Sequence, residues 1–354
     1  MRYSMLCGKL LSLLVLTCRF AGAVPLGLFV SSSSFGNGTT AYGRMATSAL
    51  QLICAHFNAS TSPNKVHSLA IDHLTDPSGA YLSDAVEALA PYFECFDAVY
   101  VGTADNHFAS DLYCKALLNA SFTHEYVKRS LAAAERFTLE HPAASMPNLR
   151  WYLNYEAAGN YFGTGCSHFT AAQEAPPPSP IVAASAFTAA YVDMFAALTN
   201  GLRALRDVSI MWSPTFNWQA SFVPDRAALL GNLSAFFARL PLLTEVANQD
   251  AVGKYSLFNI RTRAFTYNMT CADTAFYQAL LREAVRDAAA DVRVSVNMEL
   301  FSRRNTVPQS TITGDPFEHA ARKCCYSQHN LTVGPSWQIT DWYRANFIEW
   351  DPMP

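Results

Sequence analysis

Two hydrophobic patterns alternate along the chain. Short apolar runs have the length of buried strands, and longer runs repeat their apolar positions every three or four residues, as helices with one buried face do. Strands are predicted at residues 26–30, 66–71, 98–102, 151–156, 208–212, 243–247 and 292–300. Helices are predicted at residues 42–56, 84–92, 110–140, 181–206, 226–240, 273–290 and 342–347. An eighth strand falls either at residues 324–326 or at residues 331–333.

This alternation predicts the fold. Strands that alternate with helices over most of the 354 residues indicate a parallel sheet covered by helices. No Gly-x-Gly-x-x-Gly follows the first strand, which argues against a dinucleotide-binding fold. We therefore predict an α/β fold, a (β/α)8 TIM barrel in a single domain over residues 24–354. The loop after the fourth strand reaches about Pro180 and contains Pro176-Pro177-Pro178, so we expect an insertion or a lid.

Polar side chains gather where the predicted strands end. In a parallel barrel these ends share one rim, which is where the catalytic residues of TIM barrels lie. The pairs are Asp72 and His73, Asp105 and His107, Asn154 and Glu156, Ser213 and Asn217, Gln249 and Asp250, and Asn297 and Glu299. Strand ends are often polar, so the set means more than any one pair.

Two glutamates on this rim suggest a reaction. Glu156 ends the fourth predicted strand and Glu299 lies at the end of the seventh, and each follows an asparagine on the same strand face. Their carboxylates would face each other across the mouth. Glycoside hydrolysis needs such a pair, one to protonate the leaving oxygen and one to attack the sugar carbon or activate water. We predict both as catalytic; the alternative is that they close loops through salt bridges or hydrogen bonds.

The remaining rim residues are candidates for substrate binding. Amide and hydroxyl groups can hydrogen-bond sugar hydroxyls, and sugar rings stack on aromatic faces, although aromatic side chains near a barrel mouth are more often simply packed. The predicted substrate-binding residues are Tyr152, Asn154, Trp212, Ser213, Phe216, Asn217, Gln249, Asp250 and Asn297. For Asp250 the alternative role is to hold a tight turn by accepting hydrogen bonds from backbone amides.

Other chemistries have less support. The histidines are scattered, and no Cys-x-x-Cys pair has matching histidine spacing, so neither a metal nor a cofactor is predicted. No Gly-x-Ser-x-Gly motif is present. The composition, 51% hydrophobic and 15% charged, is globular, and a net charge of -3 gives no basic surface for nucleic acid.

The N-terminus has the pattern of a secretory signal. Arg2 and Lys9 precede or flank a short apolar run, and Ala21-Gly22-Ala23 is a small-residue cleavage site, so residues 1–23 are predicted to be removed. The run is too short for a membrane anchor, and no later stretch is long and apolar enough to span a bilayer. Asn-x-Ser/Thr sites begin at Asn37, Asn58, Asn119, Asn232, Asn268 and Asn330. Together these features predict a glycosylated protein that is secreted or held in the endomembrane lumen.

The cysteines fit that compartment. Of nine cysteines, Cys7 and Cys18 lie in the predicted signal, which leaves seven in the mature chain. An odd number leaves at least one thiol unpaired or paired between molecules. Disulfides are predicted as supports, because a chain of this length does not need them in order to fold. Their pairing is left open.

Several short motifs, in order, resemble a known family. They are Val99-Tyr100-Val101-Gly102, Trp151-Tyr152-Leu153-Asn154-Tyr155-Glu156, Ser213-Pro214-Thr215-Phe216, Ala247-Asn248-Gln249-Asp250-Ala251-Val252-Gly253 and Val296-Asn297-Met298-Glu299-Leu300-Phe301. The sequence resembles an uncharacterised family of glycoside-hydrolase-like TIM barrels, within the wider (β/α)8 glycosidase superfamily, over about residues 26–301. In that family the Gln-Asp turn is usually followed by Gly, where this chain has Ala251.

The resemblance implies roles for the two glutamates. The wider clan of retaining glycosidases puts its acid/base on strand four and its nucleophile on strand seven, which would make Glu156 the acid/base and Glu299 the nucleophile. The clan usually has Asn directly before the acid/base, whereas here Tyr155 intervenes. Three functions are therefore weighed. The first is a secreted glycosidase acting on an oligo- or polysaccharide. The second is a catalytically silent barrel that binds glycans or a protein partner through the same mouth. The third is a metal-assisted hydrolase using Asp72, His73 and Asp250.

Overall fold

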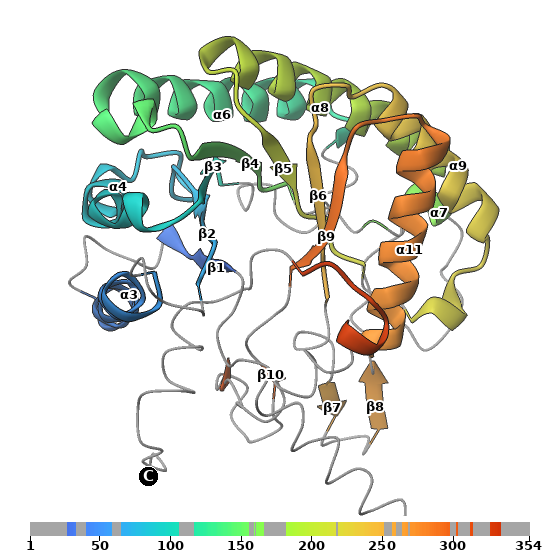
Figure 1. Cartoon of the computed structure of the whole chain (residues 1–354). Helices are drawn as coiled ribbons and strands as arrows, with labels where there is room; N and C mark the ends of the chain where they lie inside the picture. Colours follow the sequence, from blue (N-terminus) through green and yellow to red (C-terminus); the bar gives the residue numbers. More distant parts are fainter. Residues whose placement is uncertain are drawn as a thin grey trace, which may run out of the picture.

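The structure is a computed structural model of the 354-residue chain (Figure 1). It describes residues 27–32, 40–58, 65–105, 117–155, 159, 161–165, 182–216, 219–250, 257–259, 264–267, 270–297, 302–303, 312–313 and 326–333. The predicted signal at residues 1–23, the loop with Pro176-Pro177-Pro178 and the predicted helix at residues 342–347 lie outside these ranges.

A curled sheet of seven parallel strands forms the centre of the fold, and its strand order follows the chain. The strands are β1 (Gly27–Val30), β2 (Ser68–His73), β3 (Ala98–Thr103), β4 (Leu149–Leu153), β5 (Ile210–Trp212), β6 (Glu245–Gln249) and β9 (Arg293–Asn297). Each corresponds to a predicted strand, so the parallel sheet is confirmed. The boundaries differ: the fourth predicted strand ran to Glu156, whereas β4 ends at Leu153.

The two edges of this sheet are β1 and β9, so the described strands form a half-barrel. Beside β9, Val333 makes a parallel bridge with Val296, and the amide of Val296 donates to the carbonyl of Thr332. Val333 lies in the second of the two segments predicted for an eighth strand. In the first of those segments Tyr326 begins a helical turn. Closure into an eight-stranded barrel stays a prediction.

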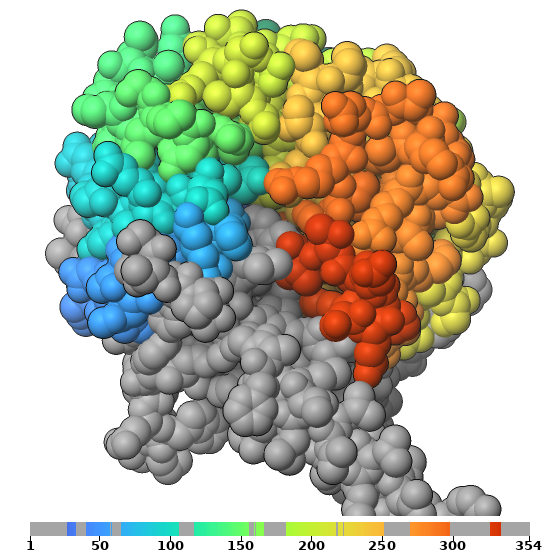
Figure 2. Space-filling view, in the orientation of Figure 1, coloured from blue at the N-terminus to red at the C-terminus, as the bar shows by residue number. Residues whose placement is uncertain are grey.

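Helices cover the convex side of the sheet, as Figure 1 shows for α4, α6, α8, α9 and α11. The α-helices are α3 (Ala41–Leu52), α4 (Ser83–Leu89), α6 (Ala120–Glu140), α7 (Tyr161–Thr164), α8 (Ala184–Leu205), α9 (Arg226–Ala238) and α11 (Cys271–Asp287). A π-helical turn η2 (Ile53–Phe57) extends α3, and short 3-10 helices are η3 (Ala90–Cys95), η4 (Pro142–Ser145) and η5 (Ala220–Phe222). Figure 2 shows the described elements following an arc from α3 to α11.

Capping residues set where the longer helices begin. The helix predicted from Ser110 begins as α6 after Asn119, because the Asn119 side chain accepts hydrogen bonds from the amides of Ser121 and Phe122. Helix α11 begins at a capping box in which Thr270 and Asp273 bond each other's backbone amides. Both signals are local, so they can be recognised in the sequence.

Two short antiparallel hairpins were not predicted. One pairs β7 (Leu257–Asn259) with β8 (Ala264–Tyr267), between β6 and α11, and the other pairs β10 (Ser302–Arg303) with β11 (Ile312–Thr313), after β9. The first lies in the stretch that the sequence pattern indicates as a loop. Two-stranded pairings add little periodic signal, because each strand is only two to four residues long.

The sheet separates two hydrophobic clusters, as strand periodicity requires. Alternate residues point to the concave side, where they form a small interior cluster: Phe29, Ala70, Tyr100, Tyr152, Met211 and Ala247. The other set packs with the helices in the main core. A disulfide between Cys54 and Cys95 joins η2 to η3 outside the sheet, and Cys271 is also disulfide-bonded. The Cys54–Cys95 disulfide thus links two segments outside the sheet, as a supporting disulfide is expected to do.

Candidate functional site

The carboxyl ends of the strands form one edge of the sheet, here called the C-terminal rim. Both predicted catalytic residues, Glu156 and Glu299, lie outside the described residues, and so does the predicted substrate-binding residue Asn217. In the sequence, Glu156 comes three residues after β4 and Glu299 two residues after β9, the seventh strand of the sheet. The structure defines the polar side chains at the ends of the strands that precede these residues.

One buried polar cluster lies at the ends of β1 to β4. The Asp72 carboxylate oxygen Oδ1 accepts from the amide of Ser32 at 2.7 Å, from the Ser32 hydroxyl at 2.8 Å and from the amide of His73 at 2.8 Å. The His73 nitrogen Nε2 lies 3.4 Å from Asp72 Oδ2 and 3.9 Å from Asp105 Oδ2. Gly102 permits this arrangement, because a Cβ atom there would lie 1.8 Å from the Asp72 carbonyl oxygen.

Asn154, a predicted substrate-binding residue, belongs to this cluster. Its Oδ1 accepts from the Thr103 hydroxyl at 2.9 Å and from the Tyr126 hydroxyl at 3.1 Å. Its Nδ2 donates to the carbonyl of Ala104 at 2.9 Å and contacts His73 Nδ1. These contacts use the whole amide, so Asn154 fixes the ends of β2, β3 and β4 relative to one another.

A second polar cluster crosses the ends of β5, β6 and β9. Asn297 Nδ2 donates to the Ser213 hydroxyl at 2.6 Å, and the Thr215 hydroxyl donates to Gln249 Oε1 at 2.9 Å. All four side chains are buried, and the buried Asn297 oxygen Oδ1 has no hydrogen-bond partner among the residues that the structure describes. The structure thus brings together three predicted substrate-binding residues, Ser213, Gln249 and Asn297. Among the described residues, one of the three, Asn297, keeps a buried acceptor without a donor.

Asp250 is close to the second cluster but has other partners. Its Oδ2 accepts from the Tyr326 hydroxyl, its carbonyl accepts from the Thr274 hydroxyl at 3.2 Å, and its amide donates to the carbonyl of Asn297 at 3.0 Å. The side chain is fully buried. These bonds hold the segment at Tyr326 and the start of α11 against the end of β6. The side chain accepts from a tyrosine hydroxyl, and the alternative role of holding a tight turn through backbone amides stays a prediction.

The predicted aromatic residues are packed. Trp212 is fully buried on the helix side of β5, where its ring lies 4.8 Å from that of Phe236 and its Nε1 donates to the carbonyl of Tyr155. Phe216 is also fully buried, and its ring stacks on Tyr277 of α11 at 4.3 Å. Tyr152 lies in the interior cluster. None of these three rings is exposed for stacking on a sugar.

The glycosidase hypothesis predicts no metal centre. The alternative hypothesis, a metal-assisted hydrolase, requires one formed by Asp72, His73 and Asp250. Within the described ranges, no group of three or more His, Cys, Asp or Glu residues is placed to hold a metal ion. Asp250 binds Tyr326, whereas Asp72 and His73 bind each other and Ser32. The described residues therefore give the metal-assisted reading no support. No helix among them is both long enough and apolar enough to cross a membrane.

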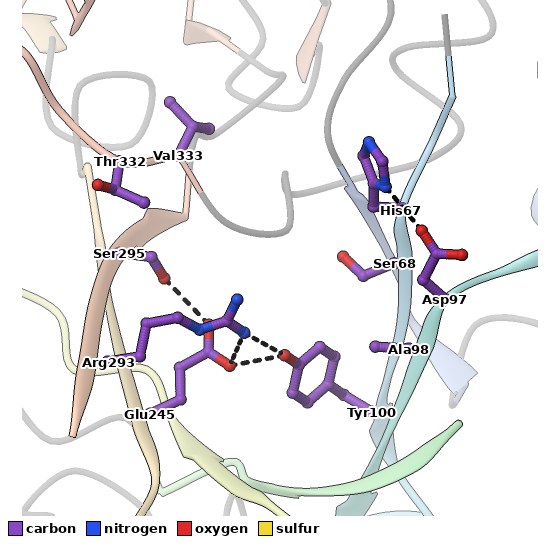
Figure 3. Close-up of a pocket in the computed structure, with 10 residues that line it drawn as sticks. All are labelled: His67, Ser68, Asp97, Ala98, Tyr100, Glu245, Arg293, Ser295, Thr332 and Val333. Carbon is purple, nitrogen blue, oxygen red and sulfur yellow. Dashed lines mark hydrogen bonds and ion pairs between the residues drawn. The ribbon is translucent and has the colours of Figure 1, made fainter. Parts of the chain in front are cut away.

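The opposite, amino-terminal ends of the strands surround a cavity of about 330 Å³, here called the floor cavity (Figure 3). One wall is formed by His67, Ser68 and Ala98 at the starts of β2 and β3. The other is formed by Glu245 and Arg293 at the starts of β6 and β9. The cavity lies at the other end of the strands from the predicted catalytic residues, so it is a separate feature from the C-terminal rim.

A charged network lines the floor cavity. The Tyr100 hydroxyl donates to Glu245 Oε2 at 2.6 Å, Arg293 donates to the same oxygen at 2.5 Å, and the Ser295 hydroxyl donates to Oε1 at 3.2 Å. Burial, and then the negative charge of Glu245, raise the pKa of Tyr100 well above its usual range. Burial alone would lower the pKa of Arg293, but Glu245 raises it. Both groups therefore keep their protons and donate at neutral pH.

Sequence reasoning did not identify this network. A signal was available, because Glu245 and Arg293 are charged residues at inward positions of apolar strands, two residues from Ala247 and Ser295. A buried charge in a strand is unfavourable without a partner, so the buried Glu245 predicts a cation nearby, which Arg293 supplies. Glu245 and Arg293 lie at the starts of β6 and β9, whereas the predicted site residues lie at or after the ends of strands.

The comparisons with known proteins show the fold. No protein-family profile and no curated protein sequence matches the chain. A Bacteroides thetaiotaomicron protein proposed to be an alpha-L-fucosidase matches with a TM-score of 0.50 and 10% identity, over 79% of this chain and 81% of that one. A thermostable mutant of a Cellvibrio japonicus xylanase has a TM-score of 0.48, 14% identity, and coverage of 92% and 87%. A Bacteroides ovatus β-mannanase has a TM-score of 0.46, 9% identity, and coverage of 93% and 85%.

The parallel half-barrel with its helices thus has the same general fold as the Bacteroides thetaiotaomicron protein. Identities of this size carry the fold and no residue roles. Membership of the family that the sequence resembles stays a prediction.

Proposed function

We propose that this protein is a retaining glycoside hydrolase that cleaves an oligo- or polysaccharide at the C-terminal rim. Glu156 would act as the general acid/base and Glu299 as the nucleophile that forms a covalent glycosyl intermediate. The observation that carries the proposal is topological. Both glutamates come within three residues after strands of one parallel sheet, β4 and β9, whose carboxyl ends lie at the same edge. These strands are not neighbours, which leaves room for a sugar between them.

The polar clusters of the rim support this proposal. Asn297, two residues before Glu299, has a buried side-chain oxygen without a partner in the described part of the chain, and a sugar hydroxyl would be a suitable donor to it. Asn154, two residues before Glu156, anchors the end of β4 to β2 and β3, so the backbone that leads to Glu156 is held in place. Catalytic groups need a supported backbone, because small displacements reduce the rate strongly.

Hydrolysis is tested with a panel of aryl glycosides and polysaccharides. We expect at least one substrate to be cleaved, and Glu156→Gln and Glu299→Gln each to reduce kcat/KM by about a thousandfold or more. Glu140→Gln, on the exposed face of α6, is the matched control and should keep full activity. Equal turnover by Glu156→Gln and the wild type would remove Glu156 from the chemistry.

The retaining mechanism has its own test. A 2-deoxy-2-fluoro glycoside of the cleaved sugar should label Glu299, because a retaining nucleophile forms a covalent intermediate. Azide should restore turnover to Glu299→Ala. Labelling of another residue, or a product of inverted configuration, would contradict these roles. A protein that binds the glycans of the panel without cleaving any of them would be the catalytically silent barrel.

We also propose that the mature protein passes through the secretory pathway. The Cys54–Cys95 disulfide supports this, because stable disulfides form in oxidising compartments. Expression of the full chain in cultured eukaryotic cells should release a protein whose first residue is Val24. Retention in the cytosol with Met1 or Arg2 at the N-terminus would contradict the proposal.

A further inference from the structure

The floor cavity exists because small residues occupy inward positions where a barrel is usually filled. Ser68 and Ala98 stand at the starts of β2 and β3, whereas bulky side chains normally close the interior of a TIM barrel. Above them, the interior cluster with Phe29, Tyr152 and Met211 is fully buried and separates the cavity from the C-terminal rim. The cavity is therefore a pocket of its own at the amino-terminal end of the strands.

The charges around the floor cavity balance one another. Arg293 is paired with Glu245 on one wall, and Asp97 on the other wall is paired with Lys65 and with His67. A bound anion would meet Glu245 and Asp97, and a bound cation would meet Arg293. Like charges within such a site are unfavourable. The lining therefore favours a neutral ligand.

The hydrogen-bonding capacity of the lining selects among neutral ligands. Arg293 bonds Glu245 and Tyr100 through one terminal nitrogen. Within the described part of the chain its Nε and other terminal nitrogen have no partner. Its side chain is 64% exposed, whereas that of Glu245 is 4% exposed, so the guanidinium faces the cavity with the carboxylate beside it (Figure 3). A guanidinium next to a carboxylate matches adjacent hydroxyl groups, which each accept from one and donate to the other.

The facing wall also offers polar groups that can form hydrogen bonds. Ser68 lines the cavity, and its hydroxyl has no hydrogen-bond partner among the described residues; the His67 imidazole lies beside it (Figure 3). A barrel end that served only stability would be better filled by apolar side chains, because burying a carboxylate such as that of Glu245 is costly even when it is paired. A polar, open lining indicates a bound solute.

We propose that the floor cavity is a binding site for a neutral, hydroxyl-rich ligand of monosaccharide size, held between Arg293 and Glu245 on one wall and Ser68 on the other. A volume of about 330 Å³ is at the lower end of the range of small-molecule sites and accommodates one sugar ring. The proposal does not rest on hydrolysis at the C-terminal rim, because the two sites lie at opposite ends of the strands.

The test is isothermal titration calorimetry of the full mature chain with a panel of free monosaccharides, with inorganic phosphate and acetate as anionic probes. One filling variant is Ala98→Leu, which places a side chain in the cavity without touching the charged network. Arg293→Lys keeps the charge opposite Glu245 but loses the planar fork. The matched control is Ala132→Leu on the exposed face of α6.

We expect at least one monosaccharide to bind with one site per chain, and phosphate and acetate not to bind. Ala98→Leu should abolish this binding, Arg293→Lys should weaken it about tenfold or more, and Ala132→Leu should leave it unchanged. Circular dichroism must show that both cavity variants are folded. If Arg293→Lys does not fold, Ala98→Leu and Ser68→Val decide the question.

Three results would overturn the proposal. The first is that no monosaccharide binds. The second is that binding persists unchanged in Ala98→Leu, which would mean that the sugar binds elsewhere on the protein. The third is that phosphate binds and the sugars do not, which would make the cavity an anion site. None of these results bears on turnover of glycosides by Glu156 and Glu299, so the two proposals fail separately.

Discussion

The Tyr100 hydroxyl donates a hydrogen bond of 2.6 Å to Glu245 Oε2 across the concave side of the sheet, from β3 to β6. The two strands are not neighbours in the sheet order, so this bond ties together parts of the half-barrel that the backbone ladder does not join directly. It also holds a buried carboxylate whose other partners are Arg293 and Ser295. This one hydrogen bond therefore both links two distant strands of the curled sheet and stabilises the buried carboxylate of Glu245.

Tyr100→Phe should destabilise the protein. The variant removes the hydrogen bond that Tyr100 donates to the buried carboxylate of Glu245, which is worth about 1.5–3 kcal/mol of the free energy of unfolding. It also removes the hydrogen bond that Tyr100 accepts from Arg293. The measurement is equilibrium unfolding in urea. Tyr81→Phe is the control, because the half-buried Tyr81 hydroxyl makes no hydrogen bond within the described ranges and its ring packs under Arg136. A loss of stability in Tyr100→Phe no larger than in Tyr81→Phe would contradict the importance of this bond.

His141 should make stability depend on pH. Burial lowers the pKa of His141 below its usual value, and its Nδ1 accepts from the amide of Ala143 at 3.2 Å. Because the folded pKa is the lower one, the unfolded chain binds the proton more readily. The stabilising contribution is therefore full above about pH 6.5 and is lost as pH falls through the folded pKa.

His141→Asn is designed to remove this dependence while keeping an acceptor for the Ala143 amide. We expect the wild type to lose more of its free energy of unfolding than the variant does when the pH is lowered from about 7.5 to about 5. A proton NMR titration of the folded wild type should place the pKa of His141 below that of an unfolded peptide. Equal pH slopes in the two proteins would show that His141 is not the group responsible.

Most of the fold could be predicted from the sequence, because apolar periodicity depends only on which face of an element is buried. All seven strands of the sheet were recognised in this way, and the segment at residues 331–333 was one of two choices for the next strand. The ends of elements were less certain. β4 stops at Leu153 because Asn154 turns to bond residues of β2 and β3, a contact that depends on tertiary structure.

The candidate site was predicted less completely. Polar residues at strand ends were located correctly, but whether a polar side chain serves structure or binding depends on partners far away in the sequence. Asn154 and Asn297 look alike in the two Asn-x-Glu motifs. Both side-chain amide atoms of Asn154 make hydrogen bonds, whereas the buried oxygen of Asn297 has no partner within the described ranges. The same holds for Trp212 and Phe216. Both are buried, and the sequence around each of them does not show that the ring packs against a distant helix.

This contrast predicts different behaviour of two alanine variants. Asn154→Ala removes the buried hydrogen bonds to the Thr103 and Tyr126 hydroxyls and to the carbonyl of Ala104, so it should lower the free energy of unfolding by about 2–4 kcal/mol. Asn297→Ala removes one hydrogen bond and one unsatisfied oxygen, so its cost should be about 1 kcal/mol or less. Urea unfolding of both variants measures the difference.

Kinetics then separates structure from binding. On a substrate identified in the glycoside panel, Asn297→Ala should reduce kcat/KM by about tenfold or more, which corresponds to one lost hydrogen bond in the transition state. Ser213→Ala, which removes the partner of Asn297 Nδ2 and leaves its Oδ1 in place, is the control and should have a smaller effect. Full activity in a stable Asn297→Ala would exclude this side chain from substrate binding.

The six predicted glycosylation sites should not be equally occupied. Asn119 and Asn330 are exposed, and their Nδ2 atoms make no hydrogen bond within the described residues. In contrast, Asn58 Nδ2 donates to the carbonyls of Val66 and Cys95, and Asn232 Nδ2 donates to the carbonyl of Phe162 at 2.6 Å. A glycan replaces one N–H of the amide and needs open surface, so it conflicts with these bonds.

Glycan occupancy can be measured site by site on protein secreted from cultured eukaryotic cells, by enzymatic deglycosylation in heavy-oxygen water followed by peptide mass spectrometry. We expect high occupancy at Asn119 and Asn330 and low occupancy at Asn58 and Asn232. Asn330→Gln should lose one glycan, whereas Asn232→Gln should leave the mass of the glycoprotein unchanged apart from the substitution. Full occupancy of Asn58 in the folded, secreted protein would contradict the bonding around η2 and η3, because Asn58 could not then donate to both carbonyls. Absence of glycans at every site would count against passage through the secretory pathway.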